Sequence, residues 1–234
     1  MTDSVRGAII AAGEGSRLRA DGYRVPKPMV EVAGLPLIGA VLRNFTTAGI
    51  TAITIILNEQ ERECAEWVRT RFPALAIDFI VKSTASSLES FREVTGRGPA
   101  GPMLVSTVDA WCAPEDFARF AAAAARRPDD ATVLAVTPFV SDEKPLWVTL
   151  GAGGRVEALG KVDSGLVTAG VYRVSDRARW LAPARELGRL REYLGWLHES
   201  GEPLYGEIIE TVVDVDRALD VASAEALARG VRRT

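Results

Sequence analysis

The sequence of 234 residues contains few of the residues that form disulfides, zinc sites and histidine-based catalytic centres. It has two cysteines, Cys64 and Cys112, and one histidine, His198. The cysteines form no Cys-x-x-Cys pair and have no histidine nearby, so we expect reduced, buried or half-buried thiols without a disulfide or zinc site. His198 lies near the end of a predicted helix, far from any nucleophile motif, which argues against Ser-His-Asp or Cys-His catalysis.

Long apolar runs and an excess of positive charge are also missing. No run reaches the roughly 18 apolar residues that a membrane-spanning helix needs. The first residues, MTDSVRGA, lack the apolar core of a signal peptide, so we expect a cytoplasmic protein without a membrane partner. The formal net charge of −3 argues against general nucleic-acid binding, although a phosphorylated small ligand needs only a local basic pocket.

Short runs rich in valine and isoleucine alternate with amphipathic segments over the first two thirds of the chain. The apolar runs predict buried strands over 8–12, 52–57, 76–81, 103–109 and 131–136. The amphipathic segments predict helices over 37–49, 59–72, 86–94 and 114–127. This order predicts an α/β fold with a doubly wound, mostly parallel, Rossmann-like sheet and helices on both faces. The loops after Ala12, Lys82 and Asp109 should meet at the carboxyl edge, where such sheets bind ligands.

The pattern changes after Phe139. Residues 145–161 predict a hairpin around four residues rich in glycine, 151–154, and a further strand follows over 165–175. We expect a long helix over 177–199, a strand over 208–216 and a last helix over 223–231. The chain is then one domain, 1–234, composed of a nucleotide-binding core (1–139), a small β-rich insertion or lid (140–205), and a returning strand with a C-terminal helix (206–234).

The first predicted strand runs into a glycine-rich loop, AIIAAGEGSRL, at residues 8–18. Glycines such as Gly13 and Gly15 let backbone N–H groups approach an anion, and Arg17 adds a forked cation, so the loop fits a phosphate cradle. An ordinary strand-to-loop turn is the alternative. The dinucleotide fingerprint is absent because Leu18 replaces its third glycine, and no GxxxxGK[ST] pattern occurs.

This loop and the segment VPKPMVEVAGLPLI (25–38) together resemble the signature AAGxGxRL and PKPMVxVxGxPLI of one family. It is the family of nucleotidyltransferases that join sugar phosphates or related alcohol phosphates to nucleoside monophosphates. The resemblance implies that the loop wraps a nucleoside triphosphate, through Ala11, Ala12, Gly13, Gly15, Ser16 and Arg17. It also implies that Lys27 contacts the phosphates.

The chemistry of nucleotidyl transfer agrees with these residue types. An acceptor oxygen attacks the α-phosphorus in line with departing pyrophosphate, so the protein must mainly position the reactants and neutralise charge. Arg17 would grip the pyrophosphate. Lys27, one of four lysines and held between Pro26 and Pro28, would offer a point charge to the phosphates. The alternative for Lys27 is a solvated loop lysine.

Triphosphate chemistry generally needs a hard divalent cation with oxygen ligands, which predicts Mg²⁺ here. Asp109 ends a buried strand and resembles the family's strand-ending aspartate, although Val108 stands where the family usually has glycine. The segment VVDVDRALDVASAEAL (212–227) resembles the family's closing WxDVGTPExLxxAE, with RAL in place of TPE. This match makes Asp214 the second metal ligand and Asp216 the alternative, and strand alternation would put both on one face.

The segment STASSLESF (83–91) resembles the part of the family that lines the base pocket. We expect Thr84, Ser86 and Ser87 to read the edge of the base, with a plain helix-capping cluster as the alternative. The AAG opening at 11–13 slightly favours a pyrimidine, and therefore CTP or UTP.

For the acceptor, position favours Lys161 as the family's acceptor lysine over the EKP sequence at 143–145, which precedes the hairpin. Thr168, Gly170 and Tyr172 match the family's TxGVYxF strand, where they could line the acceptor site or simply pack the insertion. If two of Trp111, Trp147 and Trp196 faced the acceptor, they could bind a quaternary ammonium such as that of phosphocholine.

The leading hypothesis is therefore an Mg²⁺-dependent nucleotidyltransferase that acts on a nucleoside triphosphate and a phosphorylated small-molecule acceptor, as a monomer or homodimer. A glycosyltransferase of the related nucleotide-sugar fold is an alternative, because residues 214–216 have the form DxD. A nucleotide-sensing domain without turnover is another.

Overall fold

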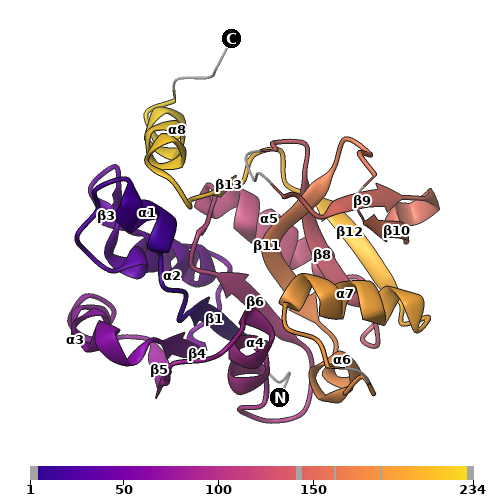
Figure 1. The fold of residues 1–234 in the computed structure, drawn as a ribbon. Helices are drawn as coiled ribbons and strands as arrows, with labels where there is room; N and C mark the ends of the chain where they lie inside the picture. The colour runs from indigo at the N-terminus through magenta and orange to yellow at the C-terminus, as the bar shows by residue number, and fades with distance from the viewer. Residues whose placement is uncertain (1–4, 141–143, 161, 185, 231–234) are drawn as a thin grey trace.

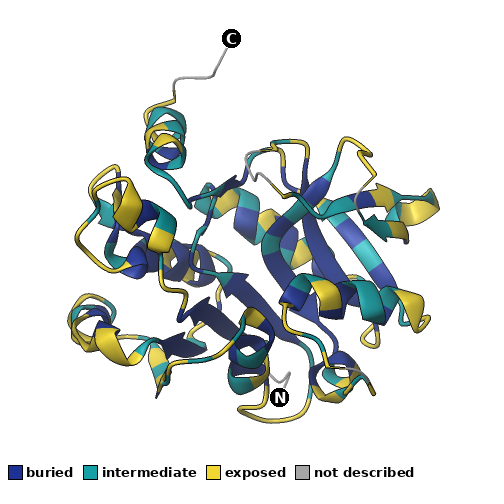
Figure 2. Cartoon of the chain, in the orientation of Figure 1, coloured by how far each residue is buried: buried dark blue, intermediate teal, exposed yellow. Residues whose placement is uncertain are grey.

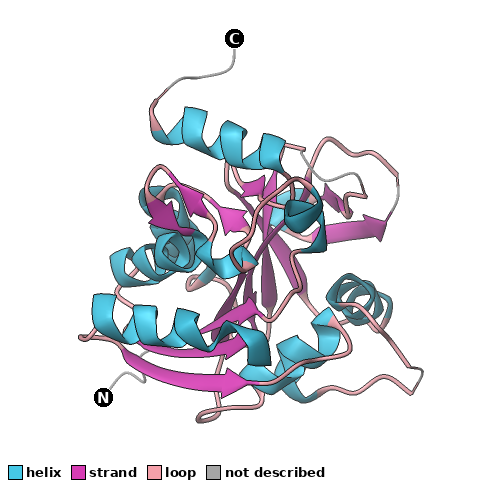
Figure 3. Cartoon of the chain, turned by 60° about the vertical axis from the view of Figure 1, so that its left-hand side comes forward, coloured by secondary structure: helices cyan, strands magenta, loops and turns pink. Residues whose placement is uncertain are grey.

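The computed structural model describes residues 5–140, 144–160, 162–184 and 186–230. One large sheet occupies the centre, and helices cover both of its faces (Figures 1 and 3). Its strands are β1 (Arg6–Ala11), β4 (Ala52–Leu57), β5 (Ala76–Val81), β6 (Met103–Thr107), β8 (Thr132–Thr137), β9 (Trp147–Leu150), β10 (Val156–Gly160), β11 (Val167–Val174) and β12 (Leu204–Ile208). Two small sheets pair β2 (Glu31–Val32) with β3 (Leu35–Pro36), and β7 (Ala110–Trp111) with β13 (Val213–Asp214).

The helices connect these strands and cover the sheet. The α-helices are α1 (Ser16–Ala20), α2 (Leu37–Thr47), α3 (Arg62–Arg71), α4 (Ser87–Thr95), α5 (Pro114–Ala124), α6 (Asp176–Trp180), α7 (Leu190–Glu199) and α8 (Ala218–Ala228). The 3₁₀ turns are η1 (Lys27–Met29), η2 (Glu59–Glu61) and η3 (Ala152–Gly154). Within the described residues, no helix is both long enough and apolar enough to cross a membrane.

The order of strands confirms the predicted mostly parallel sheet. The path runs β10-β9-β11-β6-β1-β4-β5, and the four strands from β6 to β5 are parallel to one another. The strand β11 is antiparallel to β6 on one side and to β8 on the other, and β12 extends the sheet parallel to β8. The loops after β1, β4, β5 and β6 therefore all leave at one edge.

Alternating side chains of each central strand face two separate cores. On β1, Ile9 belongs to a buried cluster with residues of α2, α3 and α5, while Ile10 belongs to a second cluster with residues of α4 and α7. Figure 2 shows the central strands as the most deeply buried part of the molecule. Cys64 and Cys112 are both buried, as their sequence context predicts.

Three predicted elements differ from the structure. The predicted helix over 177–199 is two helices, α6 and α7, because Pro183 and Gly188 lie in the intervening segment and disfavour helix continuation. The predicted strand over 208–216 is also split: β12 ends at Ile208, opposite Val136 near the end of β8, and β13 (Val213–Asp214) pairs with β7 instead. The final helix begins at Ala218 rather than at 223.

The predicted strand over 131–136 is confirmed as β8. This strand, β8, does not pair with the parallel strands, because β11 lies between it and β6. Tyr172 of β11 stands opposite Val105 on one side and Leu134 on the other. The predicted hairpin over 145–161 and the strand over 165–175 are confirmed as β9, β10 and β11. A strand from the later part of the chain therefore completes the sheet begun by the earlier part.

Candidate active site

The loop after β1 is built around a glycine that no other residue could replace without strain. Gly15 has φ of 61°, in the left-handed region that favours glycine. A Cβ atom on Gly15 would stand 2.8 Å from the Cβ atom of Lys27. At Gly13 there is open space instead, because a Cβ atom there would have no other atom within 4 Å. The loop thus packs closely against Lys27 on one side and is open on the other.

Lys27 is a buried cation held between two carboxylates. It begins η1 between two prolines, and only 8% of its side chain is exposed. Its Nζ donates to Asp109 Oδ2 at 2.6 Å and to Asp216 Oδ1. Burial alone would lower the pKa of Lys27, but the charges of Asp109, Asp216 and Asp214 outweigh burial and raise it. Lys27 is therefore charged, contrary to the alternative of a solvated loop lysine.

Arg17 joins the same network from α1. Its Nη1 donates to Asp216 Oδ2 at 2.8 Å, so the Asp216 carboxylate bridges Arg17 and Lys27. The Arg17 side chain remains 42% exposed, and it lies at the edge of the network that faces solvent. The backbone N–H of Asp216 donates to Asp220 Oδ2 at 3.0 Å, and that carboxylate also accepts from the N–H of Arg217 at the start of α8.

Three aspartates from distant parts of the chain meet beside these cations. Asp109 follows β6, and the pairing of β13 with β7 places Asp214 opposite Ala110. The N–H of Val215 donates to the Asp109 carbonyl at 3.0 Å, which fixes this junction. One carboxylate oxygen from each of Asp109, Asp214 and Asp216 lies within 4.8 Å of the others. Both candidates for the second metal ligand are thus near Asp109.

The electrostatics of this cluster suit a hard divalent cation. Burial would raise the pKa of Asp109, but the charge of Lys27 and hydrogen bonds from Lys27 and Thr107 outweigh burial and lower it. Asp109 is therefore ionised. Three carboxylates provide the oxygen donors that Mg²⁺ prefers, so the residues present fit the predicted ion. Val108, which replaces the family's glycine, is buried in the core and leaves the Asp109 carboxylate facing Lys27.

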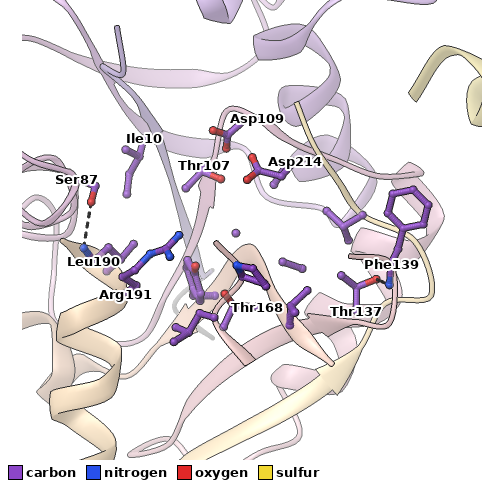
Figure 4. A pocket seen from close by; sticks show the side chains of 18 residues that line it. Ile10, Ser87, Thr107, Asp109, Thr137, Phe139, Thr168, Leu190, Arg191 and Asp214 are labelled. Carbon is purple, nitrogen blue, oxygen red and sulfur yellow. Dashed lines mark hydrogen bonds between the residues drawn. The ribbon is translucent and has the colours of Figure 1, made fainter. Parts of the chain in front are cut away.

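A cavity of about 180 Å³ opens next to Asp109 and Asp214 (Figure 4). Thr168, Gly170 and Tyr172 of β11 all line it, so the structure brings these predicted acceptor residues beside the aspartates. Gly170 has φ of 71°, and a Cβ there would stand 2.5 Å from Thr107 Oγ1. Since the register of β11 shifts between Thr168 and Tyr172, a glycine is needed at this point.

Arg191 also lines this cavity, and nothing in its local sequence marks it as a site residue. Figure 4 shows its side chain reaching into the cavity from α7. Its Nη1 donates to the carbonyl of Lys144 at 2.5 Å. The N–H of Leu190 donates to Ser87 Oγ at 3.1 Å, which joins the start of α7 to the start of α4. Only the packing of α7 over the sheet reveals Arg191 as a cation of this cavity.

The three hydroxyls predicted to read a base have different surroundings. Thr84 Oγ1 lies 2.6 Å from Ser90 Oγ, and Ser86 accepts from the N–H of Glu89 as the N-cap of α4. Ser87 lines the cavity. Ser86 is therefore a helix cap, as the alternative interpretation predicted. Contact of any of the three hydroxyls with a base stays a prediction.

Two further predictions concern the acceptor. Lys161 lies outside the described residues. None of Trp111, Trp147 and Trp196 is among the residues that line the cavity, and Trp196 stacks on Tyr193 with ring centroids 5.6 Å apart. The described residues of this cavity thus form no cage of these tryptophans for a quaternary ammonium.

A sequence model of the MobA-like NTP transferase domain matches residues 7–193. The chain belongs to this family. The matched interval includes the glycine loop, Lys27 and Asp109, and it ends before Asp214 and Asp216. The resemblance seen in the sequence is thereby confirmed.

Two curated relatives share part of the chain. A CMP-5'-(3-aminopropyl)phosphonate synthase of Streptomyces rubellomurinus is 28% identical over 90 residues, which cover 38% of this chain and 14% of that protein. A 2-aminoethylphosphonate cytidylyltransferase of Lancefieldella rimae is 30% identical over 95 residues, 38% of each chain. The matches thus span well under half the length of either relative.

Solved structures share the fold over nearly the whole chain. The inositol-1-phosphate CTP transferase from T. maritima superposes with a TM-score of 0.79 at 17% identity, covering 100% of both chains. A UDP-glucose pyrophosphorylase in complex with UDP-glucose gives a TM-score of 0.81 at 14% identity and covers 97% of this chain and 100% of that one. These likenesses confirm the fold class of this MobA-like domain.

Proposed function

We propose that the protein is an Mg²⁺-dependent nucleotidyltransferase. It transfers a nucleoside monophosphate from a nucleoside triphosphate to a phosphate or phosphonate oxygen of a small acceptor and releases pyrophosphate. One observation carries the proposal: Arg17 and Lys27 converge on three aspartates at the carboxyl edge of the sheet, directly after the glycine loop. Such an arrangement neutralises and aligns a triphosphate without a covalent nucleophile.

The glycine loop holds the nucleotide in this proposal. The backbone from Ala11 to Ser16, through Ala12, Gly13 and Gly15, wraps the triphosphate, with open space above Gly13. Arg17 binds the departing pyrophosphate and Lys27 the phosphates near the reacting phosphorus. Thr84, Ser86 and Ser87 remain the proposed base-reading hydroxyls. The two curated relatives reported above have CMP or cytidylyl in their names, which supports a pyrimidine triphosphate, CTP or UTP, as the donor.

Asp109, Asp214 and Asp216 would hold the Mg²⁺ ion. When bound, this ion would neutralise phosphate oxygens and stabilise the charge that develops at the α-phosphorus. The carboxylates also act without it, because Asp216 holds the side chains of both Arg17 and Lys27 in place. Asp220 accepts from the Asp216 backbone and so keeps Asp216 beside the loop.

The cavity beside Asp109 and Asp214 receives the acceptor. Thr168 and Gly170 form one wall, and Arg191 supplies a positive charge that attracts the acceptor's phosphate or phosphonate group. Lys161 remains a proposed contact of the acceptor, on the basis of its position in the sequence alone. An oxygen of the bound anion then attacks the α-phosphorus, and the phosphorus bond to the pyrophosphate oxygen breaks. Sugar-1-phosphates, alcohol phosphates such as inositol phosphate, and small aminoalkyl phosphonates are the candidate acceptors.

Pyrophosphate release tests this proposal. Each nucleoside triphosphate is incubated with a panel of sugar phosphates, inositol phosphate and aminoalkyl phosphonates, with MgCl₂ or with EDTA. We expect Mg²⁺-dependent release with one donor and acceptor pair, reduced about 100-fold or more in Asp109→Asn. Asp130→Asn serves as a matched control, because Asp130 is exposed in the turn before β8 and is not part of the aspartate cluster.

Two other results would contradict the proposal. Tight triphosphate binding with no release on any acceptor would favour a nucleotide-sensing domain. Transfer of sugar from a nucleotide sugar, with no pyrophosphate formed, would favour the glycosyltransferase alternative based on the DxD form of residues 214–216.

A further inference from the structure

A second cavity, of about 170 Å³, lies at the opposite edge of the sheet from the active site. It is bordered by the first residues of the parallel strands and by α6, which Figure 1 shows near the start of the chain and away from β13 and α8. Its lining consists of Val5, Arg6, Ala52, Pro99, Ala100, Gly101, Pro102, Met103 and Arg179. Among the described residues, the lining therefore includes two arginines and no acidic residue.

Arg179 is a buried guanidinium that organises the loop between α4 and β6. Only 1% of its side chain is exposed. It donates to the carbonyls of Thr95, Arg97, Pro99 and Gly101, at distances from 2.7 to 3.0 Å. Its contact with Asp176, at 3.3 Å, is longer, and the Asp176 side chain is 43% exposed. Carbonyl dipoles thus satisfy most of the Arg179 donors, while its positive charge is only partly neutralised.

Arg6 lies against the same loop without a partner. Its Nε is buried and has no hydrogen-bond acceptor, and the described residues give Arg6 no ion pair. A Cβ atom on Gly98 would stand 2.8 Å from this Nε, so the loop covers the Arg6 side chain closely. Burial lowers the pKa of Arg179 and the charge of Arg6 acts in the same direction, while Asp176 opposes both. Two like charges therefore interact beside this cavity, and Asp176, which does not line it, compensates them only in part.

We propose that this cavity is an oxyanion site, which binds the phosphate or carboxylate group of a small molecule between Arg6 and Arg179. Arg6, whose Nε has no acceptor, would donate to this group, while Arg179, which already donates to four carbonyls, would contribute mainly its charge. The anion would also relieve the unfavourable interaction between the two arginines. The site is separate from the aspartate cluster, because it lies at the start of β1, β4 and β6, whereas Asp109 follows the end of β6 and the other two aspartates lie beside Asp109.

Inorganic phosphate is the probe that tests the site. Equilibrium dialysis with labelled phosphate is carried out at constant ionic strength, with chloride as the balancing anion. We expect saturable binding that weakens about tenfold or more in Arg6→Gln, since a charge-assisted hydrogen bond is lost. Arg43→Gln is the matched control, because Arg43 is exposed in the middle of α2. Phosphate bound at the active site remains in both variants and does not affect the comparison.

A second variant keeps the test decisive if Arg6→Gln does not fold. Ala100→Asp places a carboxylate at the exposed rim of the cavity and should repel phosphate, whereas Ala152→Asp, in the exposed η3 turn between β9 and β10, should not. Identical phosphate isotherms for the wild type and the cavity variants would overturn the proposal, as would the absence of saturable binding. Competition by succinate indicates a carboxylate ligand, and binding that succinate does not displace indicates a phosphorylated one.

Discussion

At the scale of single residues, the candidate site depends on charges that compensate each other at short distances. Lys27 is buried and contacts Asp109 and Asp216, whose side chains are 22% and 30% exposed. Without the Lys27 charge, the carboxylates of Asp109 and Asp216 would repel each other in a partly buried environment, where water screens charge weakly. Stability and function at this position are therefore connected.

Lys27→Met should lower the free energy of unfolding by about 2 kcal/mol, less than for a fully buried pair because both aspartates are partly exposed. Added Mg²⁺ should restore part of this loss if the aspartates bind the ion. Urea unfolding with and without MgCl₂ at matched ionic strength measures both effects. The control Lys82→Met removes an exposed pair and should change stability by about 1 kcal/mol or less. Equal effects of the two substitutions would contradict this account.

Gly15→Ala should destabilise the protein by roughly 1–2 kcal/mol, because alanine at a positive φ is strained. Its Cβ would also displace Lys27, so turnover should fall as well. Gly13→Ala is the matched comparison: it should fold normally, since its Cβ meets nothing, yet raise the KM for the nucleotide if the open space is the nucleotide site. Thermal unfolding and steady-state kinetics of both variants separate strain from lost binding.

At the scale of elements, a short turn can carry a buried titratable group in its cap. The η2 turn after β4 is capped by Glu61, whose carboxylate accepts from the N–H of Asn58 at 3.2 Å. Burial raises the pKa of Glu61 from 4.5 to about 7, although the hydrogen bond from Asn58 and the charge of Arg19 act in the opposite direction. A buried carboxyl of this kind makes the stability of the element depend on pH.

Glu61→Gln should remove that dependence. Because the folded pKa lies above the unfolded one, the native state favours the protonated acid. The wild type and the variant should be about equally stable below pH 4.5. The wild type then loses stability as the pH rises towards 7, and above it should be less stable than the variant by about 2–3 kcal/mol. Urea unfolding between pH 4 and 8 tests this, with the exposed Glu59→Gln as control. A constant difference across this range would refute it.

At the scale of the whole molecule, β11 joins the earlier and later parts of the chain. Tyr172 stands between Val105 of β6 and Leu134 of β8, so the sheet is continuous only when the later part contributes this strand. The aspartate cluster needs the same long-range assembly, since β13 must pair with β7. The fold and the site therefore form together.

Unfolding should accordingly be one transition. We expect urea curves followed by far-UV circular dichroism and by tryptophan fluorescence to coincide, because tryptophans lie on both parts, for example Trp67 and Trp196. A fragment of residues 1–139 should show no cooperative transition, since β6 and β8 would both lose their partner β11. A fragment that folds alone, or two separated transitions, would show that the parts are independent.

Much of this organisation could be predicted from local sequence. The alternation of apolar runs and amphipathic segments predicts most strands and helices, because burial on a strand or helix face repeats over a few residues. The glycine loop, Arg17 and Lys27 are also recognisable, since Gly15 and Lys27 occupy a contiguous pattern. Asp109 is recognisable from its place after a buried strand. The breaks at 181–189 and after Ile208 could not be placed, because they depend on which strands lie alongside.

The sequence by itself determined which residues carry the chemistry of this protein. These are the glycines of the loop, the cations Arg17 and Lys27, and the aspartates, all of which occur in short local motifs. Tertiary structure alone decided how they meet. The β13–β7 pairing brings both Asp214 and Asp216 beside Asp109, the packing of α7 turns Arg191 into the cavity, and β11 enters between β6 and β8. These contacts join residues far apart in the chain, and their energies come from burial and pairing that no local pattern contains.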